Sequence, residues 1–272
     1  MKSCEELAQI EKLINSGAKE INLSNQKLNN EDIKQIAALI KNSKHIEKLY
    51  LANNSIGDEG LIALINALDN DTVTFLDLNN NAITNRGGLA IATLLEKNKR
   101  LATLGLSQNL IGSEGINAIA KAVESNTTLK ILTLAQNNFN DDSLASILGL
   151  VQKNQDLQLL FINTPKLTKE AKAQIKTAAQ ASPIAISVDA NEWISKKDTA
   201  SEQTNNANNN GDAKRRKIGE ESSQVVRRVS VTTAYNFKLH EGMKFTERND
   251  TDFDDDDNNN ANYSGLNLGS KR

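Results

Sequence analysis

Three aliphatic positions recur along the first two thirds of the chain with the spacing L-x-x-L-x-L, and an asparagine commonly follows three residues later. In the central instance these positions are Leu101, Leu104 and Leu106, followed by Asn109. The corresponding triplets elsewhere are Ala18-Ile21-Leu23, Ile46-Leu49-Leu51, Val73-Leu76-Leu78, Leu129-Leu132-Leu134 and Leu157-Leu160-Ile162. Successive triplets are 28, 27, 28, 28 and 28 residues apart, which indicates six copies of one structural unit.

Each triplet predicts a short strand, and the segment after it predicts a turn and then a helix. Glycines such as Gly112 and Gly115 lie where the helix begins, and aliphatic residues then recur at helical spacing. We attribute these glycines to close helix–strand packing and tight turning, because neither G-x-x-x-x-G-K-[ST] nor G-x-G-x-x-G occurs. The helices are expected at residues 31–41, 58–68, 86–97, 114–124, 142–153 and 169–179.

The recurring asparagines predict a structural ladder. Asn54, Asn81, Asn109 and Asn137 hold the same position in successive units, where the chain leaves its strand and turns. A carboxamide both donates and accepts hydrogen bonds, so it can satisfy backbone groups that no strand ladder reaches. We therefore assign these four side chains to the framework and not to ligand binding. Successive strands are expected to lie side by side in a parallel sheet that packs against the helices.

Residues 101–123, LATLGLSQNLIGSEGINAIAKAV, resemble the leucine-rich repeats of the ribonuclease-inhibitor type, whose consensus is close to L-x-x-L-x-L-x-x-N-x-I-x-x-x-G-x-x-x-L-A-x-x-L. The resemblance covers roughly residues 18–181. It implies an α/β solenoid, a horseshoe with a parallel sheet on its concave face and helices on its convex face. Ala18, Gln26 and Pro165 depart from the consensus in the first and last units, as terminal repeats commonly do. The family implies a protein-binding scaffold and leaves the partner unspecified.

The sequence predicts one repeat domain over residues 1–195 and a tail over residues 196–272. Residues 3–16 are expected to form an amphipathic helix that caps the first repeat. Residues 182–195, which include the single tryptophan, Trp193, are expected to close the other end. From Lys196 onward the chain is polar, rich in asparagine and aperiodic, which is typical of disorder.

Composition and charge narrow the classes of partner. The net charge is −2, so it favours neither nucleic acid nor a membrane surface. A single cysteine, Cys4, excludes an internal disulfide. The N-terminus lacks the apolar segment of a secretory signal, and no apolar run approaches the ~20 residues that span a bilayer. We therefore expect an intracellular, cytoplasmic protein that is monomeric.

Catalytic and metal-binding patterns are not recognisable. The two histidines, His45 and His240, lie far apart in the sequence, and with one cysteine they form no ligand or nucleophile set at known spacing. The acidic run from Asp254 to Asp257 lacks the spacing and the glycine of an EF-hand loop. We expect no enzymatic activity, no cofactor and no metal site.

The concave side of the predicted sheet is the candidate functional surface. Residues between the aliphatic positions point away from the core and form two columns across the strands. We expect exposed aromatic and aliphatic side chains there to bind a protein partner. The face carries little charge, whereas binding to nucleic acid would require basic side chains that contact the phosphates. The candidate contacts are Tyr50, Phe75, Asp77, Asn79, Ile131, Thr133, Leu159 and Phe161.

The tail carries two short motifs. Lys214, Arg215, Arg216 and Lys217 resemble a nuclear-import signal, and a solvated basic run is the competing interpretation. The segment RRVS resembles a basophilic kinase site with Ser230 as the acceptor. These motifs add nuclear import and phosphorylation to the hypotheses.

Three alternative functions remain open at this stage. Repeats followed by an acidic tail resemble the Ran GTPase-activating proteins, although those contain more repeats. A short horseshoe resembles the actin-capping C-terminal half of tropomodulin, although that half lacks the regular Asn-Ile-Gly turns found here. The Asn-rich acidic end, with Leu266 and Leu268, resembles the translocation signals of bacterial effectors that are secreted into host cells.

Overall fold

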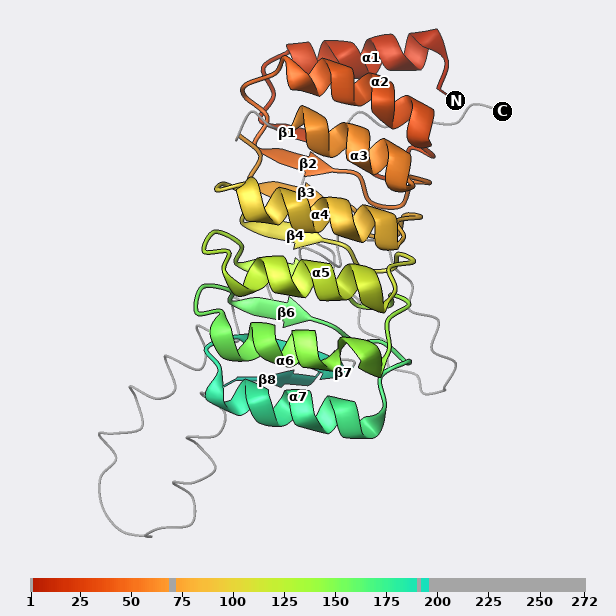
Figure 1. The fold of residues 1–272 in the computed structure, drawn as a ribbon. Coiled ribbons are helices and arrows are strands. Elements are labelled where there is room, and N and C mark those ends of the chain that lie inside the picture. The colour runs from red at the N-terminus through yellow and green to blue at the C-terminus, as the bar shows by residue number, and fades with distance from the viewer. Residues whose placement is uncertain (1, 69–71, 190–191, 196–272) are drawn as a thin grey trace, which may run out of the picture.

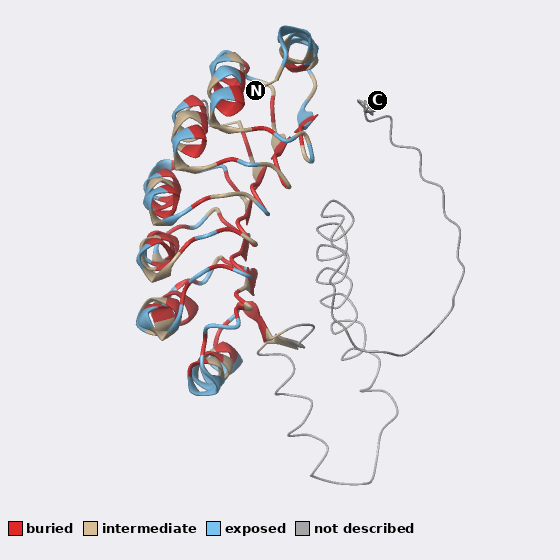
Figure 2. Cartoon of the chain, turned by 90° about the vertical axis from the view of Figure 1, so that its right-hand side faces the viewer, coloured by how far each residue is buried: buried red, intermediate tan, exposed pale blue. Residues whose placement is uncertain are grey.

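The computed structural model describes residues 2–68, 72–189 and 192–195. In this part of the chain, short strands alternate with helices to form a curved stack, with the strands along one side and the helices along the other (Figures 1 and 2). The strands follow chain order in one sheet. Neighbours are parallel from β1 to β7, and β8 returns antiparallel to β7. The predicted α/β leucine-rich repeat solenoid is thereby confirmed.

The strands are mostly three residues long, and each repeat helix spans ten residues or more. The strands are β1 (Glu20–Asn22), β2 (Lys48–Tyr50), β3 (Phe75–Asp77), β4 (Thr103–Gly105), β5 (Ile131–Thr133), β6 (Leu159–Phe161), β7 (Ala185–Asp189) and β8 (Glu192–Ile194). The helices are α1 (Cys4–Asn15), α2 (Asn30–Lys41), α3 (Asp58–Ala67), α4 (Asn85–Lys97), α5 (Ser113–Glu124), the 3₁₀ turn η1 (Asp141–Ser143), α6 (Leu144–Lys153) and α7 (Lys169–Ala181).

The helices begin and end within two residues of the predicted bounds, and one of them has a different form. The expected helix at 142–153 starts as η1, in which the backbone N–H of Ser143 donates to the carbonyl of Asn140 at 3.0 Å. The regular helix α6 begins only at Leu144. The Asn140 side chain accepts from the backbone N–H of Asp142, so a local cap favours the tighter first turn.

The core lies between the sheet and the helices and consists almost entirely of aliphatic side chains. The middle residues of the strands stand in one register across the sheet and are buried: Ile21, Leu49, Leu76, Leu104, Leu132, Leu160 and Ile186. At the N-terminal end, α1 lies against α2 and buries Ile10 and Ile14 in the same core. Because each unit covers its neighbour, burial is shared along the whole stack.

The predicted asparagine ladder is present. The Asn109 carboxamide donates to the carbonyls of Leu78 and Leu106 at 3.0 and 3.1 Å, and its oxygen accepts from the backbone N–H of Ile83 at 3.1 Å. Asn54, Asn81 and Asn137 make equivalent bonds. Each side chain joins its own turn to the preceding repeat, which confirms the framework role.

A second, unexpected ladder links the beginnings of the helices. The Asn85 side-chain oxygen accepts from the backbone N–H groups of Gly112 and Gly115 at 2.7 and 3.1 Å. A Cβ on Gly115 would lie 3.1 Å from that oxygen and 2.6 Å from the Ile111 side chain. The glycines therefore admit a helix cap from the preceding repeat, which is more specific than the packing that we expected from the sequence.

Candidate functional site

The concave face of the sheet carries the two predicted columns in the predicted register. One column contains Glu20, Lys48, Phe75, Thr103, Ile131, Leu159 and Ala185, and the other contains Asn22, Tyr50, Asp77, Gly105, Thr133, Phe161 and Ser187. No described helix or strand lies on this side of the sheet (Figure 2). The face is therefore open to approach as far as the described residues define it.

The exposure of these side chains is lower than the sequence led us to expect. Tyr50, Asp77, Asn79, Thr133 and Leu159 are buried. Phe75, Ile131 and Phe161 are half-buried. The expectation of freely exposed apolar side chains is therefore wrong. Contacts along the face contribute to the difference, since its side chains pack and hydrogen-bond across neighbouring strands.

One aromatic pair lies toward the N-terminal half of the face. The rings of Tyr50 and Phe75 come from adjacent strands, with centroids 4.7 Å apart and planes inclined by 42°. Tyr50 is opposite Asp77 in the register and Phe75 is opposite Lys48, so the rings meet diagonally across β2 and β3. The two candidate side chains therefore pack together into one aromatic surface.

A second aromatic pair lies at the C-terminal end. The rings of Phe161 and Trp193 are stacked, with centroids 6.0 Å apart and planes 22° apart. Phe161 stands opposite Ser187 in the register, and the small Ser187 side chain is buried. We expected Trp193 to close the last repeat, and its stacking on Phe161 also places it at the candidate face. The antiparallel return of β8 places it there, and the repeat pattern does not extend to that strand.

A polar cluster occupies the middle of the face. The Asp77 carboxylate accepts from the backbone N–H of Asn79 at 3.0 Å. The Asn79 carboxamide oxygen accepts from the backbone N–H of Ser107 at 2.7 Å and from the Thr133 hydroxyl at 3.2 Å. Gly105 lies between them, and a Cβ there would be 2.8 Å from Asn79 Nδ2 and 2.9 Å from Asp77 Oδ1. The glycine therefore leaves room for both side chains to lie over β4.

The carboxylate of Asp77 is electrostatically unusual. Burial raises its pKa to about 6, because desolvation disfavours the charged form, while the hydrogen bond from the Asn79 backbone acts in the opposite direction. Asp77 forms no ion pair with a lysine, arginine or histidine of the described residues. By contrast, Glu20 on the same face is paired with Lys48 at 2.7 Å. The middle of the face thus holds a carboxylate without a counter-charge.

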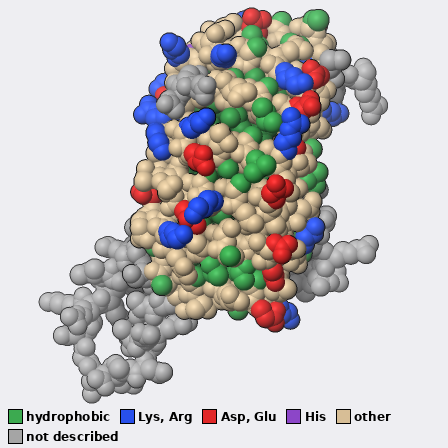
Figure 3. Space-filling view, viewed as in Figure 1, with side chains coloured by type: hydrophobic (Ala, Val, Ile, Leu, Met, Phe, Trp, Pro, Cys, Tyr) green, Lys and Arg blue, Asp and Glu red, His purple; other side chains and the backbone are tan. Residues whose placement is uncertain are grey.

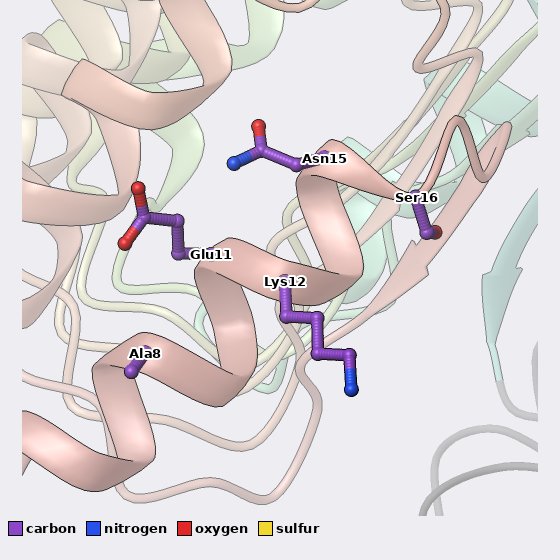
Figure 4. A pocket seen from close by; sticks show the side chains of 5 residues that line it. All are labelled: Ala8, Glu11, Lys12, Asn15 and Ser16. Atoms are coloured by element: carbon purple, nitrogen blue, oxygen red, sulfur yellow. The ribbon is translucent and has the colours of Figure 1, made fainter.

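The outer surfaces offer a weaker case for a site. On the helical face, acidic and basic side chains are scattered with both signs mixed (Figure 3). A shallow depression on α1 is lined by Ala8, Glu11, Lys12, Asn15 and Ser16, whose charged members point in different directions (Figure 4). Within the described residues no group of three or more potential metal ligands occurs, and no helix is long and apolar enough to cross a membrane. Neither the helical face nor the depression on α1 therefore brings together residues that form a recognisable site.

The tail candidates cannot be placed on this geometry. The basic tetrad Lys214, Arg215, Arg216 and Lys217 lies outside the described residues, and so does Ser230. The predicted tail over residues 196–272 lies outside them as well. Nuclear import and phosphorylation therefore stay predictions from the sequence.

Comparison with known proteins identifies the repeats. The leucine-rich repeat family model matches residues 42–64, 69–92 and 125–148. No curated protein matches the chain. These three matched segments coincide with repeats that the strand register had already aligned.

Several solved structures are similar at low identity. Leiomodin-1 actin-binding site 2 is 20% identical with a TM-score of 0.40, and the match covers 65% of this chain and 88% of that one. The tropomodulin C-terminal domain from Caenorhabditis elegans is 16% identical with a TM-score of 0.41, covering 65% and 91%. An internalin from Listeria monocytogenes is 18% identical with a TM-score of 0.43, covering 67% and 51%. The presence of leucine-rich repeats rests on the three segments that the family model matches and on the strand register, not on these structures.

Proposed function

We propose that this chain, which is a leucine-rich repeat protein, is a non-enzymatic scaffold that holds one protein partner against its concave face. The observation that carries the proposal is the distribution of side chains on that face. Two aromatic pairs, Tyr50 with Phe75 and Phe161 with Trp193, stand on either side of a polar centre. Large aromatic anchors around specific hydrogen-bonding groups are typical of protein interfaces.

The charge of the face supports a protein over a nucleic acid. Along the two columns from β1 to β6 the charged residues are Glu20, Lys48 and Asp77, and the first two neutralise each other in an ion pair. Binding to nucleic acid depends on several basic side chains that follow the phosphates. This face does not offer that pattern, whereas half-buried aliphatic and aromatic side chains suit a folded partner.

The partner surface is expected to extend over several repeats. Adjacent strands lie roughly 4.8 Å apart, so the two strand spacings from Tyr50 on β2 to Gly105 on β4 correspond to about 10 Å, and two more spacings lead to Phe161 on β6. A partner that touches both aromatic pairs must therefore cover about 20 Å of the face. That span favours a protein surface over a small molecule, with one scaffold monomer for each partner.

A capture experiment tests the proposal on the full chain. Ile131→Ala combined with Phe161→Ala shortens two half-buried side chains of the face and should abolish retention of the proteins that the wild type retains from a cell lysate. The matched control is Leu89→Ala with Leu110→Ala, which truncates two exposed aliphatic side chains outside the columns (44% and 51% exposed). The control should retain the same proteins as the wild type.

The outcome separates a binding face from a structural one. Thermal melting must first show that both double variants remain folded at the capture temperature. Retention by the concave-face variant at the wild-type level would overturn the proposal. Loss of retention in the control with normal retention by the concave-face variant would instead move the binding surface to the region around Leu89 and Leu110.

A further inference from the structure

We propose that the polar cluster over Gly105 is a binding site for one cationic side chain, arginine or lysine, of the protein partner. The site consists of Asp77, Asn79, Gly105 and Thr133, and we call it the Gly105 notch. It lies within the proposed partner-binding face, so it rests on the proposed function and defines the chemistry of the partner at its centre.

The first support is the unpaired carboxylate. Asp77 is only 1% exposed, and its one hydrogen bond within the cluster comes from the backbone of Asn79. Desolvating a carboxylate is costly unless a donor or a cation compensates it. Glu20, which is exposed on the same sheet, already has its cation in Lys48, whereas Asp77 has none among the described residues. The buried carboxylate is therefore the group on this face that most needs a cation.

The second support is an unsatisfied amide. The Asn79 side chain is fully buried, and its Nδ2 has no hydrogen-bond partner. Its orientation is fixed by the other end of the carboxamide, because Oδ1 accepts from Ser107 and Thr133. A buried donor without an acceptor is uncommon in native proteins and calls for an explanation. Since Nδ2 lies over Gly105, it points to a ligand that also offers an acceptor, such as the backbone carbonyl of the segment that carries the cation.

The third support is that glycine lets both polar groups come together over β4. Any side chain at position 105 would place its Cβ within 3 Å of both Asp77 Oδ1 and Asn79 Nδ2. The backbone of Gly105 does not adopt positive φ, so the conformation of this strand does not demand a glycine. What the missing side chain provides is room for these two polar atoms to lie side by side over β4.

A cationic side chain fits this composition better than a metal ion or an anion. The notch holds a single carboxylate, while hard cations such as Ca²⁺ take six to eight oxygen ligands. An anion would meet the charge of Asp77 at short range. A guanidinium or ammonium group supplies the donors that the carboxylate lacks. The aromatic pairs, which begin one strand away at Phe75 and two strands away at Phe161, would contact the surface from which it projects.

Titration with small probes tests the notch on the full chain. N-acetyl-arginine amide is added while the Gly105 backbone amide and the Asn79 side-chain amide are followed by ¹⁵N NMR. N-acetyl-citrulline amide, which has nearly the same shape without the charge, is the matched probe. We expect saturable shifts of both signals with the arginine probe and at least tenfold weaker binding of the citrulline probe.

Variants locate the binding. Asp77→Asn removes the charge with little change in shape and should weaken the arginine probe at least tenfold, and Gly105→Ala should do the same by displacing the Asp77 and Asn79 side chains. Glu20→Gln, which removes the other carboxylate of the columns, should leave binding unchanged. If Gly105→Ala does not fold, Asp77→Asn alone decides.

Three results would overturn the proposal. They are absence of saturable shifts in the wild type, equal binding of the citrulline probe, and unchanged binding in Asp77→Asn. Probe binding that appears only after Arg227→Gln with Arg228→Gln would place the chain's own tail in the notch and overturn the assignment to a partner. Failure here with successful capture through Ile131 and Phe161 would remove the notch and leave the proposed function intact.

Discussion

The hydroxyl of Thr133 donates to the carboxamide oxygen of Asn79 at 3.2 Å, although 54 residues separate them in the sequence. The bond passes over β4, where Gly105 has no side chain to block it. Three successive repeats are therefore joined on the concave face by side chains, in addition to the strand ladder beneath them. On this part of the concave face, the contacts of a side chain cannot be inferred from its position within the repeat.

The pH dependence of folding should carry the signature of Asp77. Its folded pKa of about 6 lies above the ordinary value of 3.8, so the folded state binds more protons between these values than the unfolded state. This contribution to the free energy of unfolding is fully present below pH 4, falls as pH rises to about 6 and then stays constant. The loss is on the order of 3 kcal/mol.

Urea unfolding of the wild type and of Asp77→Asn between pH 4 and pH 8 measures this term. The stability difference between the two should change in favour of the variant as pH rises. Groups such as Glu6 and Asp141, whose pKa values are lowered by Lys2 and Thr168 respectively, act oppositely and lose their contribution as pH falls, but they cancel in the difference. A difference that is flat across this range would contradict the desolvation of Asp77.

The helix-capping ladder predicts that two glycines respond differently to alanine. Gly115→Ala places a Cβ against Ile111 and against both the side chain and the backbone of Asn85, so it should destabilise the fold by about 1–3 kcal/mol. In Gly149→Ala the nearest atom is the flexible end of Glu124, so the higher helix propensity of alanine should leave stability unchanged or raise it by up to ~1 kcal/mol. Denaturant midpoints compare the two, and equal effects would argue against the cap.

The asparagine ladder predicts a large loss from one buried amide. Asn109→Ala leaves the Ile83 N–H and the carbonyls of Leu78 and Leu106 without this partner, which should cost about 2–4 kcal/mol. Asn138→Ala is the surface control, since its exposed side chain only accepts from Lys166 Nζ at 3.3 Å, and it should change stability by less than about 0.5 kcal/mol. Both values come from chemical unfolding, and a mild effect at Asn109 would assign the ladder a minor role.

The framework could be predicted from the sequence because it depends on a period. Leu104 and Asn109 recur in register, and each copy strengthens the interpretation of the others, so the strands, helices and columns followed. The burial of side chains on the concave face depends on contacts between the two columns, and the repeat period of the sequence does not predict these contacts. The burial of Asp77 and the room left by Gly105 depend on how Asn79 and Thr133 meet across a strand. Trp193 lies beyond the last repeat, where the chain reverses and the period ends.

The stacking of Phe161 on Trp193 gives a direct spectroscopic test of the C-terminal end of the face. Trp193 is the single tryptophan of the chain, so the emission spectrum reports this position alone. Phe161→Ala removes the ring that covers the indole, which should shift the emission to longer wavelength and cost about 0.5–1.5 kcal/mol beyond the lost area.

The matched variant is Phe75→Ala, which truncates the aromatic ring that lies next to Tyr50, three strands away from Phe161 in the sheet. It should leave the emission of Trp193 unchanged while lowering stability by a similar amount. Identical spectral shifts in both variants would mean that the fluorescence follows a general loosening of the stack. A shift confined to Phe161→Ala shows that the two aromatic pairs are independent, and a partner that needs both must then bridge the polar centre between them.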